Sequence, residues 1–201
     1  MSLQQKIFAG LYRRALGPEL LPWHRDEPPG LLKRVVEQRR SASRALDLGC
    51  GAGVYSVYLA QKGYSVVGVD FVPTALELAR ARAQAAGVSV ELLQSDVVEY
   101  EPAAGFDLVL DSGCLHHVQI ARLAAYRAAL ERCLLPGGDY VLVHFGKRHA
   151  LDWRPVGPRR RTRKQITDFL SPLRLEAYEE TSFRVGLPVG NALAGVYWFR
   201  R

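Results

Sequence analysis

The chain is poor in cysteine. Its 201 residues contain three, Cys50, Cys114 and Cys133, and no two of them have the CxxC spacing that is typical of zinc sites and redox motifs. A disulfide framework and a zinc centre are therefore not indicated, and we expect reduced thiols and no bound metal. The chemistry of this protein has to come from other residue types.

Long apolar runs are missing as well. No stretch approaches the roughly 20 consecutive apolar residues that a transmembrane helix needs, and residues 1–6 do not begin a signal peptide. These absences predict a cytoplasmic protein with no membrane partner. The length favours a single domain over residues 1–201, with a helical N-terminal segment at 1–43 and an α/β core at 44–201.

Acidic residues are fewer than basic ones. The sequence has 20 Asp and Glu against 27 Lys and Arg, which gives a net charge of +7. A charge of this size permits an anionic partner without requiring one. Much of the excess lies in one run, which contains Arg159, Arg160, Arg161, Arg163 and Lys164. A solvated surface run is the plainer interpretation, and contact with nucleic-acid phosphates is the alternative.

Short β-branched runs alternate with Ala- and Leu-rich stretches, which is typical of βαβ units and a parallel sheet covered on both faces. The pattern predicts strands at 44–48, 65–70, 89–94, 106–111 and 138–145, and helices at 3–16, 31–38, 54–62, 74–86 and 119–134. A short helix at 165–170 and two successive strands at 174–181 and 192–200 follow. Two strands in a row break the rhythm, so we expect a closing hairpin with an antiparallel edge strand.

A glycine-rich turn joins the first predicted strand to the next helix. It reads Asp47-Leu48-Gly49-Cys50-Gly51-Ala52-Gly53, and glycine permits positive φ and close approach of a ligand to the backbone. A dinucleotide fold would need GxGxxG, but the third glycine is replaced by Val54 or Ser56, depending on where counting starts. Asp47 would repel a diphosphate and suits a ligand that carries an ammonium group.

At these residues the chain resembles the class I S-adenosylmethionine-dependent methyltransferases, whose first motif is an acidic residue followed by GxGxG. The LxPGG turn at 134–138 also stands where that family has one. The resemblance implies an α/β, Rossmann-like, doubly wound sheet of seven strands, mostly parallel with an antiparallel last strand. It also implies S-adenosyl-L-methionine as cofactor and S-adenosyl-L-homocysteine as product.

Within that class, the closest patterns are those of the thiopurine, thiol and tellurite-resistance methyltransferases. Residues 49–60 fit the GCGxGxxSxYLA form, and residues 21–29 partly match a PWDxGxPxP-like stretch in which His24 and Glu27 depart from the pattern. In those relatives this stretch covers the cofactor. The resemblance therefore implies that the segment 1–43 acts as a lid, with Trp23 shielding the reaction from water or, alternatively, packing in the core.

Aspartates stand at or just past the ends of the first four predicted strands. They are Asp47, Asp70, Asp96 and Asp111. Because parallel strands end at one edge of a sheet, we expect these acids to gather at one ligand site. The resemblance implies roles for them: Asp47 and the turn residues Gly49, Cys50, Gly51 and Gly53 face the methionine part. Asp70 accepts the ribose hydroxyls, with Phe71 beside the adenine, which Asp96 and Val97 also contact. A helix cap or a turn is the alternative role for Asp70 and Asp96.

The segment after the fourth strand contains Asp111-Ser112 and the only adjacent histidines, His116 and His117. The resemblance places Asp111 and Ser112 near the cofactor and gives this segment a part in acceptor selection. A histidine titrates near neutral pH, so either one is a candidate base for removing a proton from the acceptor. The alternative is that one of them caps or packs the following helix.

Three functions remain open at this point. The favoured one is methyl transfer to a small molecule with a thiol, a selenide or chalcogen oxyanion, or a phenol. The second is methylation of RNA or protein, with the basic run as the binding surface. The third is binding of the cofactor without catalysis. An in-line displacement gains much of its rate from alignment of the reactants alone. The lack of an obvious catalytic base therefore excludes neither of the two methyltransferase functions.

Overall fold

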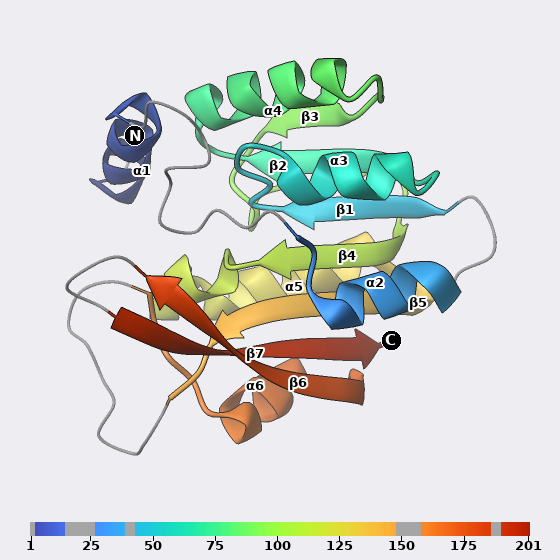
Figure 1. Ribbon diagram of the computed structural model, residues 1–201. Coiled ribbons are helices and arrows are strands. Elements are labelled where there is room, and N and C mark those ends of the chain that lie inside the picture. The colour runs from blue at the N-terminus through green and yellow to red at the C-terminus, as the bar shows by residue number, and fades with distance from the viewer. Residues whose placement is uncertain (1–2, 15–26, 39–42, 148–157, 186–189) are drawn as a thin grey trace.

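The computed structural model describes residues 3–14, 27–38, 43–147, 158–185 and 190–201. Its strands form one seven-stranded sheet in the order β3-β2-β1-β4-β5-β7-β6 (Figure 1). The strands are β1 (Arg44–Leu48), β2 (Ser65–Asp70), β3 (Glu91–Gln94), β4 (Phe106–Ser112), β5 (Leu134–Phe145), β6 (Arg174–Val185) and β7 (Gly190–Arg200). The pairs among β1 to β5 are parallel, and β7 is antiparallel to both β5 and β6. The predicted fold class is confirmed.

One detail of the predicted closing hairpin is wrong. The antiparallel strand β7 lies between β5 and β6, so β6 forms the edge of the sheet. The sequences of the two strands explain this order. In β7 the consecutive side chains Val196 to Phe199 are all buried, as expected of a strand covered on both faces, whereas the described side chains of β6 are half-buried or exposed. β5 also begins earlier than predicted, because Leu134 already pairs with Phe106 ahead of an irregularity in the register.

Helices cover both faces of the sheet. On one face lie α2 (Gly30–Gln38), α3 (Val54–Gln61) and the neighbouring α4 (Pro73–Ala85), and on the other lie α5 (Leu123–Cys133) and α6 (Arg163–Leu170) (Figure 1). The predicted helix at 119–134 begins as a short 3-10 turn, Ile120–Arg122, and a second such turn, Leu115–His117, precedes it. These turns carry the chain from the end of β4 back over the sheet edge.

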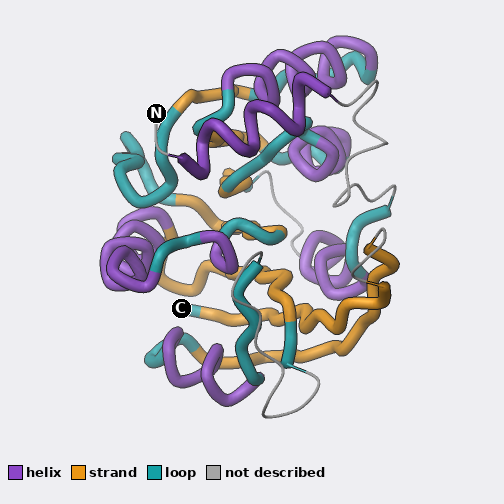
Figure 2. The backbone as a smooth tube through the Cα atoms, turned by 90° about the vertical axis from the view of Figure 1, so that its left-hand side faces the viewer, coloured by secondary structure: helices purple, strands orange, loops and turns teal. Residues whose placement is uncertain are grey.

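The N-terminal segment contains two helices with different surroundings. Leu31, Leu32 and Val35 of α2 are completely buried against the sheet, so this helix belongs to the core. Helix α1 (Leu3–Arg14) lies instead at the edge where the parallel strands end, and Figure 2 shows it crossing in front of the strand ends. Only α1 therefore has the position expected of a lid. Trp23, His24 and the rest of residues 15–26 lie outside the described part of the chain.

Helix α1 is held by a small apolar group that we call the α1 cluster. It consists of Ala9 and Tyr12 from α1, Ala52, Val72 and Ala75, with Phe8, Phe71 and Leu78 partly buried beside them. The cluster joins α1 to the glycine-rich turn, to the residues after β2 and to α4. No helix among the described residues is long and apolar enough to span a bilayer.

Candidate functional site

The glycine-rich turn follows β1 and rests on β2. The N–H groups of Gly49 and Cys50 both donate to the carbonyl oxygen of Val69, at 2.8 and 3.1 Å. Gly49, Gly51 and Gly53 all have positive φ, at 70°, 54° and 74°. Space is also limiting, because a Cβ atom on Gly53 would lie 2.8 Å from Cβ of Ala79 in α4. The turn therefore needs glycine for its backbone shape and for its packing.

Asp70 ties this turn to the end of β2. Its Oδ2 accepts from the N–H of Gly51 at 2.9 Å, and its Oδ1 accepts from the N–H of Val72 at 2.8 Å. Burial raises the pKa of this carboxyl group, while the backbone hydrogen bonds act in the opposite direction. Each carboxylate oxygen can accept more than one hydrogen bond. Asp70 thus orders the turn and keeps acceptor capacity for a ligand.

Asp47 lies next to the turn and is almost fully buried. The hydroxyl of Ser56 in α3 donates to its Oδ2 at 2.6 Å. Burial is the main cause that raises the pKa of Asp47 to about 7, and the negative charges of Asp111 and Asp70 add to it. Cys50 is buried nearby, and burial raises the pKa of its thiol. The three cysteines are free, as predicted, and burial together with the nearby carboxylates also raises the pKa of the Cys114 thiol, which disfavours its thiolate form.

Asp111, at the end of β4, is surrounded by donors of the protein itself. Its carboxylate accepts from the N–H groups of Cys114 and Leu115, at 2.7 and 2.9 Å, and from the hydroxyl of Tyr126 at 2.5 Å. The side chain has no exposed surface, and burial raises its pKa to about 6. These hydrogen bonds let Asp111 fix the segment after β4, and its expected contact with the cofactor stays a prediction. Its neighbour Ser112 is half-buried.

Asp96 follows β3 and forms an ion pair that the sequence did not predict. Its Oδ2 lies 2.6 Å from a guanidinium nitrogen of Arg122, which also bonds to Glu99 at 3.0 Å. Its Oδ1 accepts from the N–H of Val98 at 3.2 Å, which is the turn role considered as the alternative. Val97 is buried in the core. Arg122 thereby connects the segment after β4 to the segment after β3.

The two adjacent histidines point to different neighbours. The ring of His117 meets Phe8 of α1 edge-on, with centroids 4.9 Å apart. The ring of His116 is buried and contacts His144 and Phe145 at the end of β5, with centroid distances of 5.5 and 4.7 Å. Burial lowers the pKa of His117 to about 4 and that of His116 well below its ordinary value. Both imidazoles are therefore neutral at pH 7, each with one ring nitrogen that donates and one that accepts.

The residues of the basic run have different partners in the described structure. The N–H of Arg159 donates to the carbonyl oxygen of His116 at 2.9 Å, and the Arg161 guanidinium bonds to His144. Arg163 lies over the ring of Tyr178 at 4.7 Å, and Lys164 pairs with Asp168 at 2.7 Å. Contact of this run with nucleic acid stays a prediction. The sequence analysis missed the roles of His144 and of Tyr12 and Phe8 in α1, because they depend on long-range contacts.

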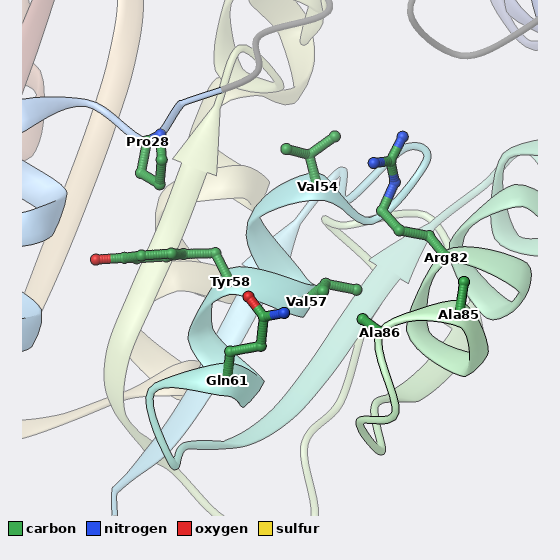
Figure 3. Close-up of a pocket in the computed structure, with 8 residues that line it drawn as sticks. All are labelled: Pro28, Val54, Val57, Tyr58, Gln61, Arg82, Ala85 and Ala86. Atoms are coloured by element: carbon green, nitrogen blue, oxygen red, sulfur yellow. The ribbon is translucent and has the colours of Figure 1, made fainter.

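A surface groove lies between α3 and α4, beginning beside the glycine-rich turn at Val54 (Figure 3). It has a volume of about 410 Å³. Its lining residues are Pro28, Val54, Val57, Tyr58, Gln61, Arg82, Ala85 and Ala86. None of them is a predicted site residue, so the candidate site remains the sheet edge. Among the described residues there is also no group of three or more His, Cys, Asp or Glu side chains arranged to hold a metal.

The sheet order, the glycine-rich turn after β1 and the acidic residues that follow the strands define the class I methyltransferase fold. A family model described as "Methyltransferase domain" matches residues 45–138. Residues 45–138 therefore match a methyltransferase domain, and the fold agrees with the predicted resemblance to the S-adenosylmethionine-dependent methyltransferases.

Curated relatives carry the same class name. The chain is 29% identical over 150 residues to a 2-heptyl-1-hydroxyquinolin-4(1H)-one methyltransferase of Mycobacteroides abscessus, covering 71% of this chain and 65% of the relative. It is 38% identical over 128 residues to a ubiquinone biosynthesis O-methyltransferase of Cereibacter sphaeroides, covering 57% and 51%. The chain thus spans about half to two thirds of the length of these relatives.

Solved structures show the same fold. TehB from Haemophilus influenzae superposes with a TM-score of 0.75 at 15% identity, covering 87% of this chain and 62% of TehB. The 1,6-didemethyltoxoflavin-N1-methyltransferase of Burkholderia thailandensis, solved with bound 1,6-didemethyltoxoflavin and S-adenosylhomocysteine, superposes with a TM-score of 0.71 at 23% identity, covering 98% of this chain and 87% of that one. These similarities extend the fold assignment to nearly the whole chain.

Proposed function

We propose that the protein transfers a methyl group from S-adenosylmethionine to a small-molecule acceptor. The observation that carries this proposal is the set of buried carboxylates, Asp47, Asp70 and Asp111, at the ends of three adjacent strands. In the described part of the chain, no cationic side chain forms an ion pair with any of them. Carboxylates held in this way are costly, and a ligand with an ammonium and a sulfonium group lowers that cost.

The residues fit the parts of that cofactor. Asp70 accepts from the two ribose hydroxyls, since its oxygens keep acceptor capacity beyond their two backbone hydrogen bonds. The glycine-rich turn and Asp47 face the amino acid end. Phe71 offers an apolar surface to the adenine, next to Val97 and Asp96. When bound, S-adenosylmethionine supplies a methyl group on a positively charged sulfur, an electrophile with a neutral leaving group.

The protein's own part in the reaction is to align and to exclude water. Helix α1 covers the sheet edge, and the α1 cluster seals it against the glycine-rich turn. Asp111 fixes the segment that carries His117, and a rigid segment keeps the acceptor in line with the methyl group. His117 is half-buried and neutral, which leaves it able to accept a proton from an acceptor that arrives protonated.

For the acceptor, we propose a hydroxylated aromatic or heteroaromatic molecule. The two curated relatives support this choice, because one is named for a 1-hydroxyquinolinone and the other as an O-methyltransferase of ubiquinone biosynthesis. Thiols, selenides and chalcogen oxyanions are the second group, supported by the GCGxGxxSxYLA pattern at residues 49–60.

The test has two stages. Calorimetry with S-adenosylhomocysteine first measures cofactor binding by the purified protein, and absence of binding contradicts the proposal. A panel of phenols, N-hydroxy heterocycles, thiols, selenite, tellurite and bulk tRNA is then screened for release of S-adenosylhomocysteine. Turnover of a phenol or N-hydroxy compound supports the proposal. Turnover of tRNA alone supports a nucleic-acid substrate, and binding without any turnover supports a non-catalytic role.

A further inference from the structure

Acidic side chains lie at the carboxyl ends of β1 to β4 but not among the residues named below at the end of β5. Asp47 and Asp111 lie one residue before the ends of β1 and β4, Asp70 is the last residue of β2, and Asp96 follows β3. The end of β5 differs, because the residues gathered there are His144, Phe145 and the incoming segment of Arg161. In an open sheet the ligand site spans the point where strand order reverses, which here lies between β1 and β4. With the acidic half suited to the cofactor, the β4 and β5 side is left for the acceptor.

Arg161 is fixed at the end of β5 by its backbone. Its N–H donates to the carbonyl oxygen of Phe145 at 3.2 Å, and its carbonyl oxygen accepts from the N–H of Lys147 at 3.3 Å. A parallel bridge between Gly146 and Arg161 accompanies these hydrogen bonds. The segment therefore runs beside β5 as a short extension of the sheet, and the position of Arg161 is set by this pairing.

The side chain of Arg161 bonds to a neutral partner. One guanidinium nitrogen lies 2.9 Å from Nε2 of His144, whose Nδ1 lies 2.8 Å from the carbonyl oxygen of Phe145. A carbonyl only accepts, so Nδ1 carries the proton and Nε2 accepts from Arg161. Burial lowers the pKa of His144 to about 3, which keeps the ring uncharged. Within the described ranges no carboxylate lies within ion-pair distance of this guanidinium, so its charge is not neutralised.

Among the described residues, aromatic rings gather around His144, the partner of the Arg161 side chain. His116 packs between His117 and His144 and stacks at a tilt against Phe145, which is itself half-buried. His116 is 7% exposed, and its Nδ1 has no hydrogen-bond partner among the described residues. A half-buried cation beside neutral aromatic rings suits a flat molecule with a negatively charged oxygen, since a fork of N–H donors binds such an oxygen strongly.

We propose that Arg161 binds the methyl acceptor and that the acceptor is an oxyanion, the phenolate or enolate form of a hydroxylated aromatic ring. This inference rests on the function proposed above. The oxygen arrives deprotonated, with its proton already lost to solvent. Its electron pair forms the new O–C bond while the electron pair of the C–S bond returns to sulfur, so that the negative and positive charges cancel. No protein base is required, which agrees with two histidines whose pKa values are low.

The test compares charge-removing variants by direct binding. The probe is 4-nitrophenol, whose ionised form absorbs differently from the neutral form, titrated in the presence of S-adenosylhomocysteine at pH values on both sides of its own pKa. We expect the wild-type protein to prefer the ionised form. Arg161→Gln should weaken binding of that form by about ten- to a hundredfold, which corresponds to the loss of a charged hydrogen bond. It should leave binding of the neutral form and of S-adenosylhomocysteine unchanged.

Arg174→Gln is the matched control. It removes the same charge from the first residue of β6, where the side chain is 72% exposed, and it should have no effect. Arg161→Lys keeps the positive charge but loses the forked set of N–H donors, so we expect an intermediate affinity for the ionised nitrophenol. It serves as the second variant if Arg161→Gln does not fold.

Two results would overturn this inference and leave the proposed function standing. One is a wild-type protein that binds S-adenosylhomocysteine without preferring the ionised nitrophenol, and the other is Arg161→Gln with wild-type affinity for it. No binding of S-adenosylhomocysteine overturns the proposed function as well.

Discussion

The ring of Phe8 in α1 meets the ring of His117 edge-on, with centroids 4.9 Å apart. The same ring also meets Phe71, which follows β2, at 6.1 Å. One side chain of α1 therefore touches the segments that leave two strands on opposite sides of β1. This bridge supports our proposal that α1 acts as the lid over the cofactor.

Removing the bridge should loosen the lid. Phe8→Ala deletes two aromatic contacts, each of about 0.5–1.5 kcal/mol, and should raise the dissociation constant for S-adenosylhomocysteine several-fold, mainly through faster dissociation in stopped-flow measurements. Ile7→Ala is the control, because Ile7 lies on the same helix and is 54% exposed. Equal dissociation rates for the two variants would contradict a lid role for Phe8.

Asp70 should recognise the ribose. Asp70→Asn removes the charge and should cost about 1.5–3 kcal/mol of binding for each charged hydrogen bond that is lost. The specific readout uses calorimetry with S-adenosylhomocysteine and its 2′,3′-dideoxy analogue. We expect the wild-type protein to prefer the natural nucleoside and the variant to lose most of that preference. A variant that keeps the full preference would falsify the role of Asp70.

Asp47 should make the ligand-free protein less stable as the pH rises. Its pKa in the folded protein, about 7, lies above the ordinary value of 3.8, so folding favours the protonated form. The stabilising contribution is present at acid pH and is lost as the pH rises toward 7 and beyond. Asp47→Asn should therefore flatten the fall in melting temperature between about pH 4 and pH 7. Part of the fall in melting temperature should remain in this variant, because burial also raises the pKa of Asp111.

The control for this experiment is Asp168→Asn, since Asp168 is exposed on α6. It should leave the pH dependence of the melting temperature as in the wild type. Asp47→Asn should also bind S-adenosylhomocysteine more weakly, because the ammonium group loses a carboxylate partner. An unchanged pH dependence in Asp47→Asn would show that the carboxylate is ionised throughout this range.

Alanine substitutions at Gly53 and Gly63 should distinguish the cost of backbone strain from the cost of a steric clash. Both have positive φ, but a Cβ on Gly53 would meet Ala79 at 2.8 Å, whereas nothing lies within 4 Å of a Cβ on Gly63. Gly63→Ala should lower the free energy of unfolding by about 1–2 kcal/mol, the cost of a left-handed alanine. Gly53→Ala should lose clearly more, because α4 has to shift. Urea denaturation measures both, and equal losses would rule out the packing effect.

The parts of this structure that the sequence predicted depend on short-range patterns. The strand that contains Asp47 runs directly into the glycine-rich turn, and Asp70 ends the next strand along the chain, so local patterns locate them. Contacts such as Arg122 with Asp96 and Arg161 with His144 join segments whose distance is set only by the packing of helices on the sheet. No local pattern marks these pairs. The burial of Asp111 was missed for the same reason, since its donor Tyr126 comes from the following helix.

The position of β7 inside the sheet has a consequence for synthesis on the ribosome. β5 lacks a neighbour on one side, and β6 lacks its only partner, until the residues up to Arg200 have left the exit tunnel. Until then, nascent chains expose unpaired edges on both β5 and β6, and such edges can pair with other chains and cause aggregation. We expect such chains to depend on chaperones until the last strand inserts, however early the glycine-rich half has folded.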